Sequence, residues 1–378
     1  MIYKEFKNLK LSALGMGMMR LPVKGQGDVP VDEEATEKMI DYAMGQGINY
    51  FDTAYGYHEG QSELTAGKLL TKYPRSSYYL ADKFPGYDLA NMDKVEEIFE
   101  EQLKRCQTEY FDFYLFHNVC EMNIDAYLDE TYGIMDYLLK QKKAGRIHYL
   151  GFSVHGSYDV MNRFLEAYGD EMEFCQIQLN YLDWEFQDAK SKVKLLGEYN
   201  LPVWVMEPLR GGSLASLSVK DESALKALRP EELVPAWAFR YLQTLPGITM
   251  ILSGMSNFEQ MKANIATFEE EKPLNDREMT ALMQIADEMI QNIGLPCTAC
   301  SYCVAHCPQG LDIPRLLGLY NEHRSTATAA GFIAPMALSA MPEEKHPAAC
   351  IGCRSCEAVC PQQLKISEAL ADFAQMVK

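Results

Sequence analysis

The feature that most constrains the fold is a repeated alternation of short apolar segments with amphipathic ones. The apolar segments are rich in β-branched and aromatic residues and are bounded by turn residues, which is typical of buried strands. Eight segments are expected to be strands: 14–18, 48–52, 78–83, 111–117, 147–153, 174–179, 202–206 and 248–253. Strands that alternate with helices form parallel sheets, because the chain must cross back before each new strand begins. The sequence therefore predicts an α/β fold with a parallel sheet.

Amphipathic helices fill the intervals between these strands. After the acidic residues 32–34, apolar side chains recur at helical spacing as far as Met44, and Gly45 and Gly47 end the helix. Further helices are expected over 62–70 and 93–106. Eight strand and helix units in about 270 residues fit a closed (β/α)8 TIM barrel. A doubly wound open sheet is the alternative, and it is weakened because no Gly-x-Gly-x-x-Gly follows a strand.

The sequence changes character after this alternating region. Helical spacing over 276–290 leads into a Gly-Leu-Pro stretch that ends at Pro296, and two dense groups of cysteines follow. We expect the barrel to occupy 1–275, a connecting helix and linker to occupy 276–296, and a small ferredoxin-like iron-sulfur domain to occupy 297–378.

The charge of the chain limits its partners. Its 378 residues include 53 acidic and 35 basic residues, for a net charge of -18. This excess disfavours binding to nucleic acid or to an anionic membrane surface, because both repel it. No apolar run is long enough to span a membrane, and the first residues lack the apolar stretch of a signal peptide. These features predict a cytoplasmic protein with neither nucleic acid nor membrane as a partner.

Eight of the eleven cysteines form two runs with the same spacing. The first run is Cys297, Cys300, Cys303 and Cys307, and the second is Cys350, Cys353, Cys356 and Cys360. Each run has the form Cys-x2-Cys-x2-Cys-x3-Cys-Pro, the pattern of bacterial two-cluster ferredoxins. In those proteins, three cysteines of one run and the fourth of the other hold each [4Fe-4S] cluster.

The spacing therefore predicts two [4Fe-4S] clusters. We expect one cluster on Cys297, Cys300, Cys303 and Cys360, and the other on Cys350, Cys353, Cys356 and Cys307. Zinc is the alternative metal, since pairs of Cys-x2-Cys also bind zinc. Disulfides are not expected in a cytosolic chain.

Polar side chains recur at the carboxyl ends of the predicted strands, where TIM barrels carry their active sites. A buried carboxylate such as Asp52 needs a partner, because burying an unpaired charge costs several kcal/mol. Asp52 could hold Lys83 charged, and a nearby ammonium would lower the pKa of Tyr57 by about 1 to 3 units. His117 could orient a carbonyl oxygen by hydrogen bonding. These four residues form a candidate site for proton transfer.

The order and spacing of Asp52, Tyr57, Lys83 and His117 resemble the catalytic tetrad of the aldo-keto reductases. The resemblance covers roughly residues 1–270. It implies that Tyr57 is the general acid, that Lys83 and Asp52 tune it, and that His117 orients the substrate. Tyr55 is the competing phenol, but only Tyr57 has the family's offset of five residues from Asp52.

The resemblance also implies a nicotinamide cofactor, NADH or NADPH, across the mouth of the barrel. The residues expected to contact it follow the predicted strands: Gly17, Met18, Asp52, Ser153, Gln176, Pro208, Leu209, Arg210, Gly211, Gly254, Gln260 and Asn264. Among these, Ser153 and Gln176 would bind the carboxamide, and Arg210 could supply charge to the pyrophosphate. Gly254 and Gln260 replace the family's basic residues that read a 2′-phosphate, so NADH and NADPH both stay open.

These features together predict an oxidoreductase that interconverts a small-molecule carbonyl and an alcohol, with hydride from the nicotinamide. Hydride transfer moves two electrons at once, whereas each cluster moves one. A second hypothesis is therefore a reductase that receives single electrons through the clusters from a ferredoxin-like partner, with a flavin as an additional cofactor. A third is a redox-sensing binding subunit without turnover, since the fold also occurs in channel-associated subunits.

Overall fold

The computed structural model describes residues 1–25, 29–295, 297, 303–325, 333–360 and 363–378. The described residues divide into two compact units, Met1–Leu209 with Glu231–Met279, and Arg210–Pro230 with Thr280–Lys378. We call the first the barrel unit and the second the C-terminal unit. This division differs from the predicted one, because residues 210–230 group with the C-terminal unit although they lie within the barrel sequence. The segment 276–296, predicted as a separate connection, is divided between the two units after Met279.

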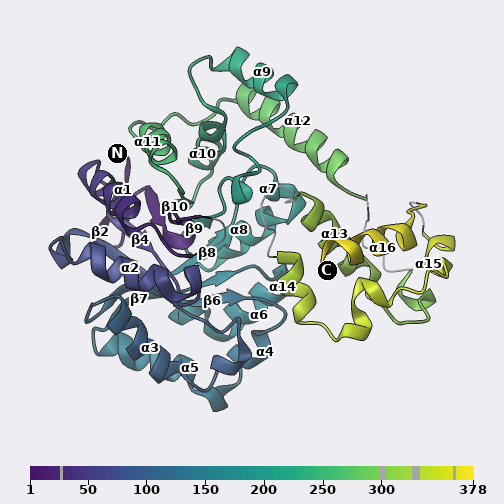
Figure 1. Cartoon of the computed structure of the whole chain (residues 1–378), viewed down its shortest axis with the longest axis horizontal. Coiled ribbons are helices and arrows are strands. Elements are labelled where there is room, and N and C mark those ends of the chain that lie inside the picture. The colour runs from purple at the N-terminus through teal and green to yellow at the C-terminus, as the bar shows by residue number, and fades with distance from the viewer. Residues whose placement is uncertain (26–28, 296, 298–302, 326–332, 361–362) are drawn as a thin grey trace. The chain divides into compact units, whose positions relative to one another are not determined.

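The barrel unit contains a closed barrel of eight parallel strands (Figure 1). Neighbours around the barrel follow the order β10-β3-β4-β5-β6-β7-β8-β9. The strands are β3 (Leu14–Gly17), β4 (Tyr50–Asp52), β5 (Tyr79–Phe84), β6 (Phe111–Val119), β7 (Ile147–Val154), β8 (Phe174–Gln178), β9 (Val203–Met206) and β10 (Ile248–Gly254). The predicted TIM barrel is confirmed, and all eight predicted strands are present within a few residues of their expected ends.

The helices between the strands surround this barrel (Figure 1). The longer ones are α1 (Glu33–Gly45), α2 (Gln61–Leu70), α3 (Val95–Arg105), α5 (Ile134–Lys143), α6 (Tyr158–Tyr168), α8 (Ala189–Glu198), α10 (Val234–Thr244) and α11 (Phe258–Thr267). Two short helices, α4 (Ile124–Tyr127) and α7 (Asp183–Phe186), complete the unit. Among the described residues, no helix is both long and apolar enough to cross a membrane.

Aromatic side chains fill the interior of the barrel. Tyr50, Phe113 and Trp204 are completely buried in one cluster. A two-stranded hairpin, β1 (Tyr3–Phe6) and β2 (Leu9–Ser12), adds Phe6, whose ring centroid lies 5.0 Å from that of Trp204. Side chains on a strand alternate between its two faces. The residues two positions beyond these interior aromatics therefore also point inward, nearer the carboxyl ends of the strands.

The C-terminal unit is helical in its described part. Its helices are α9 (Val219–Leu228), α13 (Ile313–Ser325), α14 (Ile333–Ser339), α15 (Ser355–Ala358) and α16 (Ile366–Met376), and α12 (Asp276–Ile293) leads into it from the barrel unit. Leucine and phenylalanine side chains of α13 and α16 form a small apolar core, and Cys303 and Cys356 are buried in that core. The unit therefore places part of its cysteine set against apolar side chains.

Candidate active site and cysteine pocket

Most of the predicted polar residues lie at the carboxyl ends of the strands, where the register aligns them with residues of the neighbouring strands. Gly17 is aligned with both Asp52 and Gly254 in the strand register, and Ser153 is aligned with Gln176. Asp52 lies two residues after the interior Tyr50, so strand alternation turns it inward as expected. The sequence predicted these positions because the alternation is a local property of each strand.

Lys83, near the end of β5, is the centre of the site. Its side chain is completely buried, and its Nζ donates hydrogen bonds of 2.6 Å to Asp52 Oδ1 and 2.6 Å to the carbonyl oxygen of Thr53. The same nitrogen lies 3.5 Å from the phenolic oxygen of Tyr57. An ammonium has three protons to donate, and these three oxygens account for them.

The Asp52 and Lys83 side chains form a buried ion pair. Burial alone would lower the pKa of Lys83, but the negative charges of Asp52 and of an ionised Tyr57 raise it above its ordinary value. Burial also raises the pKa of the Asp52 carboxyl, and the Lys83 ammonium opposes that rise. Asp52 Oδ2 is buried and has no hydrogen-bond partner within the described chain. The contact between the two groups thus keeps Lys83 protonated through the neutral range.

The sequence-based expectation that the pKa of Tyr57 falls below its ordinary value is wrong. Burial raises the pKa of the Tyr57 phenol by more than the Lys83 ammonium lowers it, and the Asp52 charge adds to the rise. Tyr57 is therefore protonated at neutral pH. A protonated phenol can donate a proton to a carbonyl oxygen.

His117 contacts the Tyr57 ring, with the two ring centroids 5.9 Å apart in an edge-to-face arrangement. Burial lowers the pKa of His117 well below its usual range, and the Lys83 ammonium lowers it further. The imidazole is therefore neutral at pH 7, and its Nδ1 is buried without a hydrogen-bond partner in the described residues. A neutral imidazole can still donate one hydrogen bond to a carbonyl oxygen.

Tyr87 is a residue of this site that the sequence reasoning missed. Its ring makes an edge-to-face contact with His117, with the two ring centroids 5.2 Å apart. Burial raises the pKa of the Tyr87 phenol to about 12. A Cβ at Gly56 would lie 2.3 Å from the Tyr87 hydroxyl, which explains why position 56 carries a glycine. The only sequence signal for Tyr87 is its position four residues after Lys83, in the segment that follows the strand end.

The competing residues beside Tyr57 have other contacts. The hydroxyl of Tyr55 donates a 2.9 Å hydrogen bond to Glu101, and the Arg105 guanidinium lies over its ring. The buried His58 accepts a hydrogen bond at Nε2 from the backbone N–H of Leu21. The Lys83 ammonium lies within hydrogen-bond distance of the Tyr57 hydroxyl, whereas the Tyr55 hydroxyl is bonded to Glu101.

Two of the predicted carboxamide ligands are neighbours in the barrel. Ser153 Oγ accepts a 2.8 Å hydrogen bond from the backbone N–H of Asn118, which leaves its own proton available for donation. Gln176 contacts Met206 Sδ through its Nε2, at 3.8 Å. Its Oε1 is buried and has no partner among the residues described. A buried acceptor of this kind fits the N–H group of a carboxamide, so the residues present suit a nicotinamide.

The residues predicted near the adenosine end make mainly structural contacts. Gln260 Oε1 accepts a 2.8 Å hydrogen bond from the backbone N–H of Ser256, so its side chain closes the turn before α11. Asn264 donates to Ser253 Oγ at 3.1 Å. Lys262, the nearest cation in this segment, pairs with Glu259 at 3.3 Å. Met18, in the turn after β3, is completely buried.

The predicted pyrophosphate loop, which contains Pro208, Leu209, Arg210 and Gly211, follows β9. Arg210 and Gly211 both have positive φ angles, 47° and 63°, which describe a tight left-handed turn. The Arg210 side chain is completely buried and forms an ion pair with Glu322 of α13, within the C-terminal unit. The arginine thus contacts a carboxylate of its own chain, a partner that its local sequence does not reveal.

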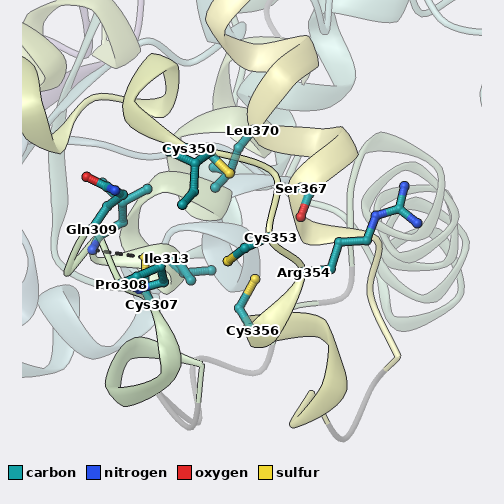
Figure 2. A pocket seen from close by; sticks show the side chains of 12 residues that line it. Cys307, Pro308, Gln309, Ile313, Cys350, Cys353, Arg354, Cys356, Ser367 and Leu370 are labelled. Carbon is teal, nitrogen blue, oxygen red and sulfur yellow. Dashed lines mark hydrogen bonds between the residues drawn. The ribbon is translucent and has the colours of Figure 1, made fainter.

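A pocket in the C-terminal unit is lined by four of the predicted cluster ligands (Figure 2). They are Cys307, Cys350, Cys353 and Cys356. This set combines the last cysteine of the first run with the first three of the second, which is the combination expected for one cluster. Ile313 and Leu370 contribute apolar surface to the same lining.

Hydrogen-bond donors surround these sulfurs. The backbone N–H of Leu311 donates to Cys307 Sγ at 3.4 Å, and Ser367 Oγ, on the pocket lining, is buried without a partner in the described residues. The backbone N–H and hydroxyl of Ser355 lower the pKa of the Cys353 thiol. Donors of this kind stabilise thiolate ligands. In the described part of the chain, however, no three His, Cys, Asp or Glu side chains gather closely enough to hold a metal ion.

The other predicted cluster set is only partly described. Cys297 and Cys360 are half-buried and Cys303 is buried, whereas Cys300 lies outside the described residues. Three cysteines of the barrel unit, Cys106, Cys120 and Cys175, are buried and lie outside the two runs.

The aldo/keto reductase family profile matches residues 13–287 of this sequence, most of the chain. The chain belongs to the aldo/keto reductase family. A second profile, described as a 4Fe-4S dicluster domain, matches residues 296–365. Both matches confirm the resemblance seen in the sequence, and the protein is an oxidoreductase with an iron-sulfur domain attached to the reductase barrel.

Known relatives match this chain with low sequence identity. The L-galactose dehydrogenase of Arabidopsis thaliana is 26% identical over 313 residues, which cover 76% of this chain and 94% of that protein. The NADH-specific methylglyoxal reductase of Escherichia coli is 23% identical over 325 residues, covering 75% and 97%. The probable aldo-keto reductase 1 of Glycine max is 28% identical over 233 residues, covering 58% of this chain and 64% of that protein.

Solved structures give the same fold. The holo form of an aldo-keto reductase from Bacillus halodurans matches with a TM-score of 0.62 and 24% identity. The match covers 75% of this chain and 96% of the Bacillus halodurans chain. An aldo-keto reductase from Klebsiella pneumoniae in complex with NADPH has a TM-score of 0.61 and 19% identity, covering 76% and 96%. At these identities the likeness concerns the barrel architecture.

Proposed function

We propose that this chain reduces a small-molecule carbonyl compound to an alcohol, with Tyr57 as the proton donor. The observation that carries the proposal is the position of the buried Lys83 ammonium between Asp52 and Tyr57. The ammonium stabilises the negative charge that develops on the phenolic oxygen as its proton leaves, and Asp52 holds the ammonium in place. Because the phenol is protonated at neutral pH, its proton is available when substrate binds.

His117 would orient the substrate. Its neutral imidazole can donate a hydrogen bond to the carbonyl oxygen, which places that oxygen beside the Tyr57 hydroxyl. Tyr87 would form a wall of the same pocket, since its ring contacts His117. The substrate is therefore a small carbonyl compound that tolerates an aromatic surface next to the reacting carbon.

Ser153 and Gln176 would hold the carboxamide of a nicotinamide cofactor, which supplies a hydride when bound. The buried Gln176 Oε1 supports this assignment, because it lacks an internal partner among the described residues. Gly17, Met18, Gly254, Gln260 and Asn264 would contact the rest of the cofactor. NADH and NADPH are both candidates, since neither Gly254 nor Gln260 is basic and Lys262 already pairs with Glu259.

The eight cysteines of the C-terminal unit would hold two [4Fe-4S] clusters that transfer electrons. Cys307, Cys350, Cys353 and Cys356 would bind one cluster, which is supported by their shared pocket. Cys297, Cys300, Cys303 and Cys360 would bind the other. This electron-transfer function favours a second candidate, in which a ferredoxin-like partner passes single electrons through the clusters to a flavin, and Tyr57 still donates the proton.

The direct test uses full-length protein purified without oxygen, with methylglyoxal and a panel of aldehydes and sugars as substrates. Oxidation of NADH or NADPH by these carbonyls is the expected result. Tyr57→Phe should lower kcat by about 10²-fold or more, whereas Tyr55→Phe, whose hydroxyl bonds to Glu101, should retain turnover. Equal rates in the Tyr57→Phe variant and the wild type would exclude Tyr57 as the proton donor.

The same protein separates the two candidates. If NADH and NADPH fail to bind in a fluorescence titration while FMN binds, the flavin-linked reaction is favoured. If reduced nicotinamide is oxidised by the carbonyl without flavin, the hydride route holds. Iron analysis should give about eight iron atoms per chain, and a colourless protein containing zinc would contradict the cluster assignment.

A further inference from the structure

Both backbone polar groups of Lys83 are held by side chains from outside the barrel interior. The pairing of β4 with β5 ends at Ala81, so the β4 edge supplies no partner for the peptide groups of Lys83. The N–H of Lys83 donates to Asp82 Oδ1 at 2.8 Å, and its carbonyl oxygen accepts from Gln102 Nε2 at 2.9 Å. The position of the Lys83 backbone therefore depends on Asp82 and Gln102, in addition to the pairing of β5 with β6 that aligns Lys83 with Leu115.

Gln102, on α3, links these contacts into one buried group. Its Nε2 also lies 2.9 Å from Asp82 Oδ1 and 3.1 Å from Oε1 of Glu63, which is on α2. The hydroxyl of Tyr114 donates to Gln102 Oε1 at 2.6 Å, which fixes the orientation of the amide. Glu63, Asp82 and Gln102 are all completely buried. The amide nitrogen has two protons but three oxygen atoms within reach, so it cannot donate to all three at once. The other printed donors to the two carboxyls are the Cys106 thiol, 3.7 Å from Asp82 Oδ2, and Arg105, 2.8 Å from Glu63 Oε2.

The positive charges near Glu63 and Asp82 likewise do not balance a full negative charge on both carboxyls. The titratable and charged groups around the two carboxyls are Arg105 and Cys106 from α3 and its end, Lys83 on β5, and Tyr114 on β6. Arg105 binds Glu63 Oε2 at 2.8 Å but also pairs with Glu101, and the Lys83 ammonium is committed to Asp52. Burial raises the pKa of Asp82 well above its usual range, and the nearby Glu63 adds to the rise.

We propose that Asp82 and Glu63 share one proton, and that with Gln102 they are positioning residues that fix the Lys83 backbone. The inference rests on the proposed role of Lys83 in proton transfer. A shared proton lets Asp82 accept the Lys83 N–H without placing a second full negative charge behind the ammonium. A second charge there would compete with Asp52 for Lys83 and would make Tyr57 a weaker acid.

Infrared spectroscopy of the full-length iron-loaded protein tests the shared proton without any measurement of turnover. At neutral pH the wild type should show the carbonyl stretch of a protonated carboxylic acid, and Asp82→Asn should abolish that band. Asp112→Asn is the matched control, because Asp112 is a buried strand carboxylate paired with Arg75 at the other end of the barrel. The proposal is overturned if the wild type lacks the band or if the band survives in Asp82→Asn.

The pH dependence of stability gives a second readout. A carboxyl with a raised pKa holds a proton in the folded state that the unfolded state releases, so its contribution to stability is lost as pH rises above about 4. The melting temperature of the wild type should therefore fall relative to that of Asp82→Asn as pH rises from 4 through neutrality. A constant difference between the two proteins across this range would contradict the shared proton.

Kinetics test the positioning role. Gln102→Leu keeps the volume of the side chain but removes the donor to the Lys83 carbonyl, so kcat should fall about tenfold with KM nearly unchanged. An unchanged kcat in this variant would refute positioning by Gln102. If carbonyl reduction itself is not observed, the infrared band still decides whether the proton is shared, so failure of the proposed function is distinguishable from failure of this inference.

Discussion

The two sites of this chain differ in how completely the protein alone assembles them. In the barrel unit, Lys83 already makes hydrogen bonds to Asp52 and Thr53 and lies 3.5 Å from Tyr57. In the C-terminal unit, four cysteines line one pocket, but among the described residues they are not gathered closely enough to bind a metal ion. Packing and ion pairing therefore bring the barrel residues together, whereas the proposed cluster ligands share a pocket without forming such direct contacts.

This difference follows from the chemistry of the ligands. The ammonium of Lys83 and the carboxylate of Asp52 attract each other, so packing them together lowers the electrostatic cost of burying each. Cysteine thiolates repel one another, and only a bound cation compensates that repulsion.

Loss of one cluster ligand should produce the largest change. Cys356→Ser removes a sulfur from the pocket cluster, so the iron content should fall from about eight to about four atoms per chain. Cys175→Ser is the matched control, because Cys175 is a buried cysteine of the barrel unit outside the two runs. Iron analysis and visible absorption provide the measurement. Full iron content in Cys356→Ser would show that this pocket is not a cluster site.

Removal of the buried ammonium should affect both stability and turnover. Lys83→Met leaves Asp52 as an unpaired buried charge, which should reduce the free energy of unfolding by about 3 to 5 kcal/mol. The kcat for carbonyl reduction should also fall by about 10²-fold or more. Combining Lys83→Met with Asp52→Asn should restore much of the stability and none of the turnover. Denaturant unfolding and steady-state kinetics measure the two effects, and recovered turnover in the double variant would contradict the assigned roles.

A buried ion pair of the C-terminal unit should contribute more to stability than an exposed one. Glu322→Gln replaces the carboxylate that contacts the buried Arg210 guanidinium with a neutral amide, and it should destabilise the protein by about 3 kcal/mol. Glu288→Gln breaks the exposed pair with Lys220 and should have little effect on stability, because solvent screens such a pair. Denaturant unfolding of the iron-loaded variants compares them. Equal costs would indicate that iron, and not this ion pair, determines the stability of the unit.

The smallest predicted effect concerns His117 and pH. The pKa of His117 is lowered in the folded protein, so the unfolded state binds a proton near pH 6.5 that the folded state excludes. The contribution of this residue to stability is therefore present above that pH and is lost as pH falls below it. His117→Gln should reduce the loss of melting temperature between pH 7 and pH 5. An identical pH dependence in the variant and the wild type would contradict a buried neutral imidazole.

The sequence predicted the barrel and the contacts of Lys83 with Asp52 and Tyr57 because both depend on strand patterns. The alternation of side chains along each strand turned Asp52, Lys83 and His117 inward at the strand ends, and the repeated cysteine spacing anticipated the four residues that share a pocket. Strand alternation and cysteine spacing can each be recognised from a few residues that are close together in the sequence.

Other features depend on tertiary contacts that no local pattern contains. The pKa of Tyr57 reflects a balance between burial and the Lys83 charge, and only the folded environment decides which is larger. The partner of Arg210 is a glutamate 112 residues away in the chain. Tyr87 contacts His117 from a segment without a recognisable motif. The buried group of Glu63, Asp82 and Gln102 likewise joins three separate elements.

The most direct test of the difference between the two sites is hydrogen exchange, followed by mass spectrometry, on full-length protein with and without iron. If packing alone assembles the barrel site, removal of iron should increase exchange in residues 297–378 and leave β4, β5 and β6 as protected as before. Increased exchange in the strands that carry Asp52, Lys83 and His117 would contradict this account, because the tetrad would then depend on the metal as well.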